Sequence, residues 1–182
     1  MNPPERDLRE ISSDIANKRN DDAIQKIKDD PSLVHCVSQS SKLSLLKISM
    51  MEENYRIFHH LLDLMDHDVY LTKDVLYDRD SYTSIMFSML YGTSEITKQL
   101  IQKFQNINEQ DKLYKRTALH VMIKYDPYSI EQLKVLLENG ADVSIQDKYG
   151  RTPKEYAMKY PERNKLIIEL LEEHEQKQKQ HH

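Results

Sequence analysis

The sequence predicts an all-α protein built from tandem repeats, in which each repeat is a pair of helices. Apolar residues recur at helical spacing along the 182 residues, and the alternation typical of strands is nearly absent. The chain has only three glycines, which disfavours an all-β protein with many tight turns. A phrase that begins Thr-Ala-Leu-His at Thr117 is answered by Thr-Pro-Lys-Glu at Thr152, 35 residues later. Self-similarity at this period indicates units that stack on one another.

The repeats become weaker towards the N-terminus when they are aligned on this threonine. Thr83 begins a unit 34 residues before Thr117, and a less regular unit lies at 44–62. Residues 15–20 and 23–27 predict the helix pair that begins the stack. We expect a single domain, 1–182, with units at about 8–40, 41–77, 78–111, 112–146 and 147–174 and a polar tail at 175–182.

Several residues of the repeated motif can be explained by the local structure that they favour. The threonine hydroxyl caps the first helix of a repeat by accepting a backbone N–H. Pro153 suits the first turn of a helix, where no N–H is needed. Gly140 follows a helix at a point where a left-handed backbone is wanted. His120 is expected to hydrogen-bond neighbouring loops and so to tie adjacent repeats together.

Two connections depart from the regular period. The unit at Thr117 carries two extra residues within 125–129, between its two helices. Ser129 and Gln132 have capping-box spacing there, which predicts the start of the second helix. The longer link at 66–78 predicts an extended loop. Past residue 174 the chain is strongly polar, as expected for the wet outer face of a terminal repeat.

The phrase at Thr117 is followed by Val-Leu-Leu-Glu-Asn-Gly-Ala-Asp-Val at 135–143. Together these letters resemble the ankyrin-repeat family, whose core reads T-P-L-H-x-A with a period near 33. The resemblance covers roughly residues 44–171. It implies an all-α ankyrin-repeat solenoid of helix-turn-helix units joined by β-turn fingers, with a polar C-terminal cap helix. It also implies a non-enzymatic protein–protein interaction module with no shared cofactor.

Within the ankyrin pattern, two kinds of position face the concave groove. One is the β-turn finger just before the threonine, and the other is the pair of residues at the end of the first helix. Carried over to this sequence, the partner-binding residues are Arg79, Tyr82, Leu90, Tyr91, Tyr114, Arg116, Lys124, Tyr125, Lys148, Tyr149, Arg151, Lys159 and Tyr160. The finger positions also include Asp80 and Leu113.

Six of the eleven tyrosines fall at these positions, and the charges beside them are mostly Lys and Arg. Tyr and Arg are enriched at interface hot spots, because an aromatic ring gives a large contact area at little entropy cost. The sequence therefore predicts a protein partner with an acidic or aromatic docking segment. The alternative is that a finger tyrosine packs on the next finger and that the Lys and Arg side chains are ordinary surface residues.

The remaining sequence features disfavour other classes of function. No apolar run approaches the roughly 18 residues of a membrane span, and the start lacks the apolar stretch of a signal peptide. A net charge of −4 argues against direct nucleic-acid binding. Cys36 is alone, so no internal disulfide is possible, and a buried apolar thiol is expected. His59, Asp63 and His67 share one helical face but are expected to be solvated, so no metal site is predicted. Nothing indicates a cofactor or a small-molecule substrate.

We expect an inhibitor, adaptor or regulatory subunit, present as a monomer or in a hetero-complex in the cytoplasm or nucleus. One alternative is a viral or bacterial effector that sequesters a host protein in the host cytoplasm. Another is an enzyme with an unrecognised site at His35 and Cys36 or at 59–67. A third is self-association.

Overall fold

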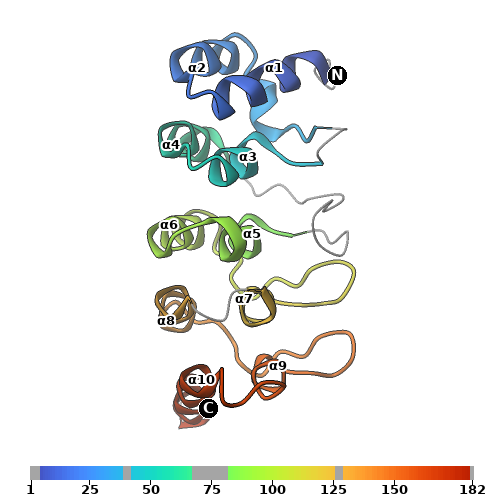
Figure 1. The fold of residues 1–182 in the computed structure, drawn as a ribbon, viewed down its shortest axis with the longest axis vertical. Helices are drawn as coiled ribbons and strands as arrows, with labels where there is room; N and C mark the ends of the chain where they lie inside the picture. Colours follow the sequence, from blue (N-terminus) through green and yellow to red (C-terminus); the bar gives the residue numbers. More distant parts are fainter. Residues whose placement is uncertain (1–4, 39–41, 67–81, 126–128, 181–182) are drawn as a thin grey trace. The chain divides into compact units, whose positions relative to one another are not determined.

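The computed structural model describes residues 5–38, 42–66, 82–125 and 129–180 (Figure 1). Within these ranges the protein is helical and no strand forms, although Val37 and Ser44 make an isolated antiparallel bridge. The all-α prediction is confirmed. The chain divides into two compact units, residues 1–87 and 88–182. The expected single domain and its unit boundaries stay predictions.

The N-terminal unit contains two helix pairs. The first pair is α1 (Glu5–Ala16) and α2 (Asn20–Asp29), and the second is α3 (Leu45–Met51) and α4 (Tyr55–Leu64). A short 3-10 helix, Pro31–His35, follows α2. Helix α1 packs on α3, and α2 packs on α4, so the pairs stack with equivalent helices together. The helix pair expected near residues 15–27 is present, but residues 17–19 form the turn between its helices.

Polar side chains join successive segments of the N-terminal unit. The Asn54 carboxamide oxygen accepts the N–H of Ile57 at 3.4 Å and so caps α4, while its Nδ2 donates to the Ile15 carbonyl at 2.9 Å. Lys47 is fully buried, and its Nζ donates to the carbonyl of Tyr82 at 2.7 Å. A buried ammonium needs such acceptors, because its desolvation is otherwise costly.

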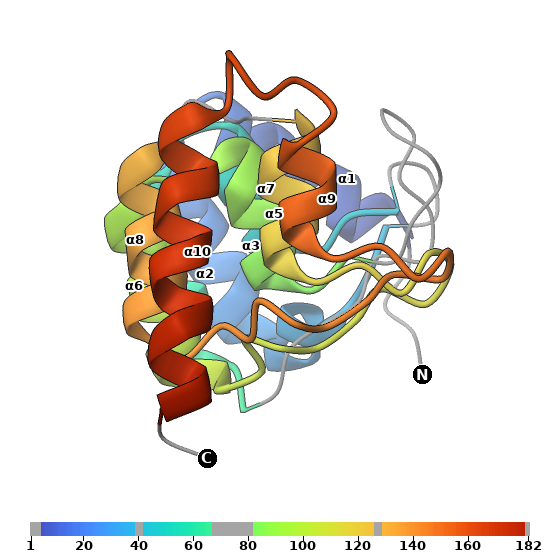
Figure 2. The same cartoon turned by 90° about the horizontal axis from the view of Figure 1, so that it is seen from below.

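Helix α5 (Ser84–Tyr91) crosses the boundary between the units, and the C-terminal unit continues with five helices. These are α6 (Ser94–Phe104), α7 (Ala118–Tyr125), α8 (Ile130–Glu138), α9 (Pro153–Ala157) and α10 (Lys165–Gln180). Helix α7 packs on α9, and α8 packs on α6 and α10. Figure 2 shows that the loops before α7 and α9 extend to the same side of this unit, away from α8 and α10. The polar segment from residue 175 is helical as far as Gln180.

The helix ends of the C-terminal unit confirm most of the local predictions. Thr152 and Glu155 form a complete capping box around Pro153 at the start of α9. Gly140 has a φ of +88°, in the left-handed region that glycine tolerates. Helix α8 begins at Ile130, directly after Ser129 as predicted, but the capping box at Ser129 does not form. The Ser129 hydroxyl instead donates to the Gln132 side chain, whose Nε2 donates to the buried carbonyl of Ser88 at 2.7 Å. The extended loop predicted at 66–78 lies almost wholly outside the described residues.

Candidate functional site

Two fingers of the C-terminal unit are each organised around an aspartate. We call residues 105–117 the first finger and residues 139–152 the second finger. The Asp111 carboxylate accepts the N–H groups of Leu113 at 3.0 Å and Tyr114 at 2.6 Å. The Asp147 carboxylate accepts those of Tyr149 at 2.8 Å and Arg151 at 3.0 Å. A carboxylate that binds the amides following it fixes a tight turn, so both fingers have a defined backbone.

Each aspartate also binds the arginine that directly precedes the repeat threonine. Arg116 Nε lies 2.9 Å from Asp111, and Arg151 Nη2 lies 2.7 Å from Asp147. Burial acts to raise the pKa of Asp147, but hydrogen bonds from Arg151 and Tyr156 hold that pKa well below its usual range. At Asp111 burial prevails and raises the pKa, despite the N–H groups that the carboxylate accepts. Each guanidinium is thus offset by a carboxylate in its own finger.

The two fingers contact each other directly. The Lys148 N–H donates to the Tyr114 carbonyl at 2.7 Å, and Gln110 Nε2 donates to the Gln146 carbonyl at 2.8 Å. The rings of Tyr114 and Tyr149 lie side by side, with centroids 6.4 Å apart. Backbone and side chains therefore join the fingers into one continuous edge.

His120 connects α7 to the second finger. Its Nδ1 accepts the Thr117 N–H at 3.1 Å, so Nε2 carries the proton and donates to the Arg151 carbonyl at 2.9 Å. Burial lowers the pKa of His120, which keeps the ring in this neutral form. The predicted tie between adjacent repeats is confirmed.

A family model described as ankyrin repeats (3 copies) matches residues 15–147 and 85–181. The chain belongs to the ankyrin-repeat family. A protein named as an ankyrin repeat protein of Fowlpox virus (strain NVSL) is 40% identical over 73 residues, which cover 40% of this chain and 16% of the relative. One named so in Rickettsia felis (strain ATCC VR-1525 / URRWXCal2) is 29% identical over 117 residues, covering 59% of this chain and 48% of the relative. The chain therefore spans less than half the length of either relative.

Ankyrin repeats are in general non-enzymatic modules for protein–protein interaction. No helix in the described part of the chain is both long enough and apolar enough to cross a membrane. Across those residues, no group of three His, Cys, Asp or Glu side chains is placed to hold a metal ion. Burial raises the pKa of Cys36, whereas a nucleophilic thiol needs a lowered pKa.

Several of the predicted ankyrin contact residues lie at the surface. Tyr149 and Tyr160 are 61% and 51% exposed. Lys124 and Lys159 are exposed beside the tyrosines that follow them, with Nζ 4.5 Å and 5.4 Å from the ring centroids. The other exposed predicted residues are Lys148 and Arg151, and Leu90, Tyr91, Tyr114 and Tyr125 are half-buried. Arg79 and Asp80 lie outside the described residues.

Tyr82 and Arg116 are not surface residues, so their assignment to a binding surface is corrected. They are 0% and 1% exposed, and each directly precedes the threonine of its repeat. The Arg116 guanidinium pairs with buried Asp111 and lies 4.7 Å from the centre of the Tyr114 ring. Arg151 has the same position in the second finger, yet its side chain is 50% exposed. Both side chains are part of the protein interior, so they are not accessible to a partner.

The sequence analysis missed four finger residues. Two are Asp111 and Asp147, which set the shape of the fingers, and two are Lys112 and Lys115, which are exposed on the first finger. A signal was available, because an Asp-Lys pair precedes the Arg-Thr pair in both fingers. An aspartate that precedes a short connection favours a turn in which its carboxylate accepts the N–H groups that follow it.

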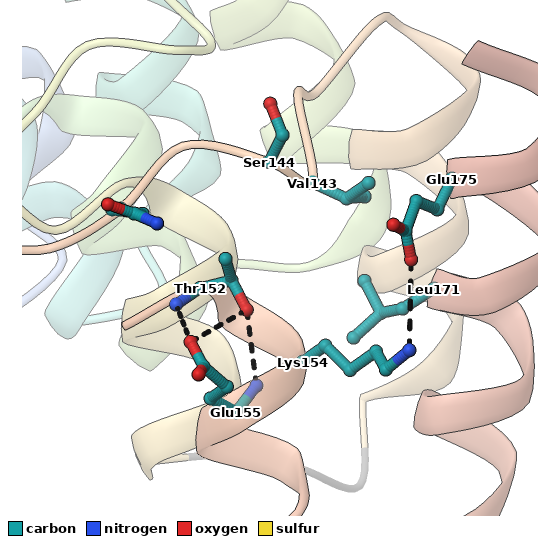
Figure 3. Close-up of a pocket in the computed structure, with 8 residues that line it drawn as sticks. Val143, Ser144, Thr152, Lys154, Glu155, Leu171 and Glu175 are labelled. Carbon is teal, nitrogen blue, oxygen red and sulfur yellow. Dashed lines mark hydrogen bonds and ion pairs between the residues drawn. The ribbon is translucent and has the colours of Figure 1, made fainter. Parts of the chain in front are cut away.

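A hollow of about 380 Å³ lies between the second finger, the start of α9 and the side of α10 (Figure 3). Figure 3 shows Glu155 directed back to Thr152 and Lys154 directed towards Glu175 across Leu171. Lys154 also pairs with Glu172 at 3.1 Å. Lys154 therefore joins α9 to α10 through ion pairs, while Glu155 is held in the capping box at the start of α9.

Proposed function

We propose that this ankyrin chain is a non-enzymatic binding module that captures an acidic segment of a protein partner on the fingers of its C-terminal unit. The finger surface consists of Lys112, Leu113, Tyr114, Lys115, Lys148 and Tyr149. The observation that carries the proposal is the exposure of Leu113 (42%) and Tyr149 (61%) on two adjacent, directly bonded fingers. Exposed apolar side chains gathered among cations are a feature of interaction sites.

The sign of the charge on the finger surface favours an acidic partner. Asp111 and Asp147 offset the guanidinium groups of their own fingers. Lys112, Lys115 and Lys148 are exposed and add positive charge to the same surface. Carboxylates of a partner would complement this charge, while the two apolar side chains would bury its apolar groups.

The rigidity of the fingers supports tight binding. A surface whose backbone is already fixed loses little conformational freedom when a partner docks, so more of the contact energy appears as affinity. The carboxylate-centred turns, the Lys148 N–H bond to Tyr114 and the His120 bridge supply that order. Lys124 and the half-buried Tyr125, at the end of α7, extend the proposed surface along that helix.

A module of this kind acts by occupying a partner, as an inhibitor, adaptor or regulatory subunit. The two relatives come from a virus and a bacterium, which favours a second candidate role, an effector that sequesters a host protein. Both roles rest on the same binding surface and differ only in whose protein is bound.

The test compares two double variants with equal numbers of exposed apolar residues. Leu113→Ser with Tyr149→Ala disrupts the finger surface, and Leu64→Ser with Tyr55→Ala changes residues of the N-terminal unit that are 47% and 39% exposed. Proteins captured by the wild-type chain are identified by mass spectrometry, and the affinity of a purified partner is measured by calorimetry. We expect the finger variant to lose at least about tenfold in affinity and the control to stay within about twofold. Equal binding by both variants, with unchanged circular dichroism, would contradict the proposal.

A further inference from the structure

The turn between α9 and α10, together with the first residues of α10, exposes a second group of apolar side chains. Met158, Tyr160 and Leu166 are 51%, 51% and 50% exposed. They are three of the seven exposed large hydrophobic residues in the described part of the chain, and they fall within nine positions. Single exposed apolar residues are ordinary on a soluble protein, whereas several exposed close together are a feature of interaction sites.

Cations lie beside the Tyr160 ring and along the same segment. Lys159 Nζ lies 5.4 Å from the centroid of the Tyr160 ring, and Arg163 Cζ lies 5.1 Å from it. Lys165 is exposed at the start of α10, and Glu162 is the one acid between residues 158 and 166. The segment therefore carries a net positive charge next to its exposed apolar surface.

The backbone of the turn is held from within. Asn164 is 1% exposed, and its Nδ2 donates to the Ala157 carbonyl at 2.8 Å. The Tyr160 N–H donates to the same carbonyl at 3.2 Å, and the Asn164 N–H donates to the Tyr160 carbonyl at 3.0 Å. These hydrogen bonds fix the backbone position of Tyr160. The turn therefore loses little conformational entropy when a partner binds.

We propose that Met158, Lys159, Tyr160, Arg163, Lys165 and Leu166, the turn patch, form a second docking surface that takes an acidic amphipathic peptide segment. The apolar side chains of such a segment would cover Met158 and Leu166, and its carboxylates would lie among the three cations. A peptide fits better than a lipid surface, because three apolar side chains on one short, rigid turn offer little area for insertion into a bilayer.

The turn patch shares no residue with the finger surface, and only its Lys159 and Tyr160 are contact positions implied by the ankyrin resemblance. It therefore goes beyond the proposed function and can exist without it. A partner that carried two acidic segments could engage both surfaces at once. Its second contact would then be intramolecular, which raises overall affinity without any new kind of contact.

The experiment uses the full chain with Leu113→Ser and Tyr149→Ala, so that binding at the finger surface does not contribute. The probe is a synthetic peptide in which glutamates flank one phenylalanine and one leucine, and its binding is followed by amide chemical shifts of the ¹⁵N-labelled protein at low salt. We expect the largest shifts between residues 157 and 167. Adding Met158→Ser and Leu166→Ser should weaken binding at least about tenfold, and so should replacing the peptide glutamates with glutamine.

Adding Leu64→Ser with Tyr55→Ala is the matched control and should leave the affinity within about twofold. The inference is overturned if the peptide shifts no amides between residues 157 and 167, or if the glutamine peptide binds equally well. It is also overturned if only phosphatidylserine vesicles bind, or if light scattering shows that a second copy of the chain covers the patch. Because the finger surface is already disabled, failure here leaves the proposed function standing.

Discussion

Replacing Asp147 with alanine tests whether a carboxylate holds the second finger in place. The side chain of Asp147 is fully buried and accepts hydrogen bonds from the N–H groups of Tyr149 and Arg151 at 2.8 Å and 3.0 Å. It also accepts bonds from Arg151 Nε at 3.1 Å and Nη2 at 2.7 Å, and from the Tyr156 hydroxyl at 2.7 Å. The variant removes all of these acceptor contacts while adding no bulk.

The expected loss follows from what the variant leaves without an acceptor. A buried polar group that loses its partner costs about 1–3 kcal/mol, and two backbone N–H groups and one hydroxyl are affected. These groups are only partly buried, so the lower end of that range applies to each. The Arg151 guanidinium is 50% exposed and regains water, so its ion pair adds little. We therefore expect the free energy of unfolding to fall by about 3 kcal/mol.

Urea unfolding followed by circular dichroism measures this loss, and amide hydrogen exchange at Tyr149 and Arg151 reports the finger itself. Asp142→Ala is the matched control, because its carboxylate accepts only exposed bonds from the Ser144 N–H and hydroxyl. The control should lose less than about 1 kcal/mol. If both variants lost the same free energy, or if exchange at Tyr149 were unchanged by Asp147→Ala, the carboxylate would not organise the finger.

Three further predictions concern the hydrogen bonds and packing between repeats. Burial lowers the pKa of His120 below its usual 6.5, so its contribution to stability is complete above that pH and is lost as the pH falls below it. Thermal unfolding should show this loss of stability as the pH falls below 6.5, and His120→Gln should flatten it. Lys47→Met keeps the length of the side chain but removes the Nζ donor to the buried Tyr82 carbonyl, and should cost about 1–3 kcal/mol in urea unfolding. Gly92→Ala would place a Cβ 2.8 Å from the Ser88 carbonyl oxygen, and the shift needed to relieve this contact should lower the melting temperature; an unchanged melting temperature would show that the backbone adjusts freely.

The features that could be predicted from the sequence depend on neighbours close along the chain. The capping box of Thr152 and Glu155 and the left-handed Gly140 need only local spacing to be recognised. The helix pairs follow from apolar periodicity for the same reason. Ser129 shows the limit of this reasoning, because Gln132 has a more demanding acceptor in the buried Ser88 carbonyl, 44 positions away.

Exposure could not be predicted in this way. Tyr82 and Tyr149 both belong to the finger positions that are predicted to contact a partner, because both lie just before a repeat threonine. Tyr82 directly precedes its threonine and is 0% exposed, whereas Tyr149 lies three positions before its threonine and is 61% exposed. Arg116, which also directly precedes a threonine, is buried like Tyr82. Arg151 holds the same position before Thr152, yet its side chain is 50% exposed. Exposure therefore depends on the three-dimensional path of each finger and not on the distance from the threonine alone.

The repeats keep one hydrogen bond in common even where the residue that donates it differs. His120 stands three residues after Thr117 and donates to the carbonyl of Arg151, the residue before Thr152. In the N-terminal unit, Lys47 stands three residues after Ser44 and donates to the carbonyl of Tyr82, the residue before Thr83. An ammonium and a neutral imidazole thus fill the same role, because the buried carbonyl requires a donor rather than a particular side chain. Alignment on hydrogen-bond roles therefore identifies a repeat at residues 44–64 that alignment on letters shows only weakly.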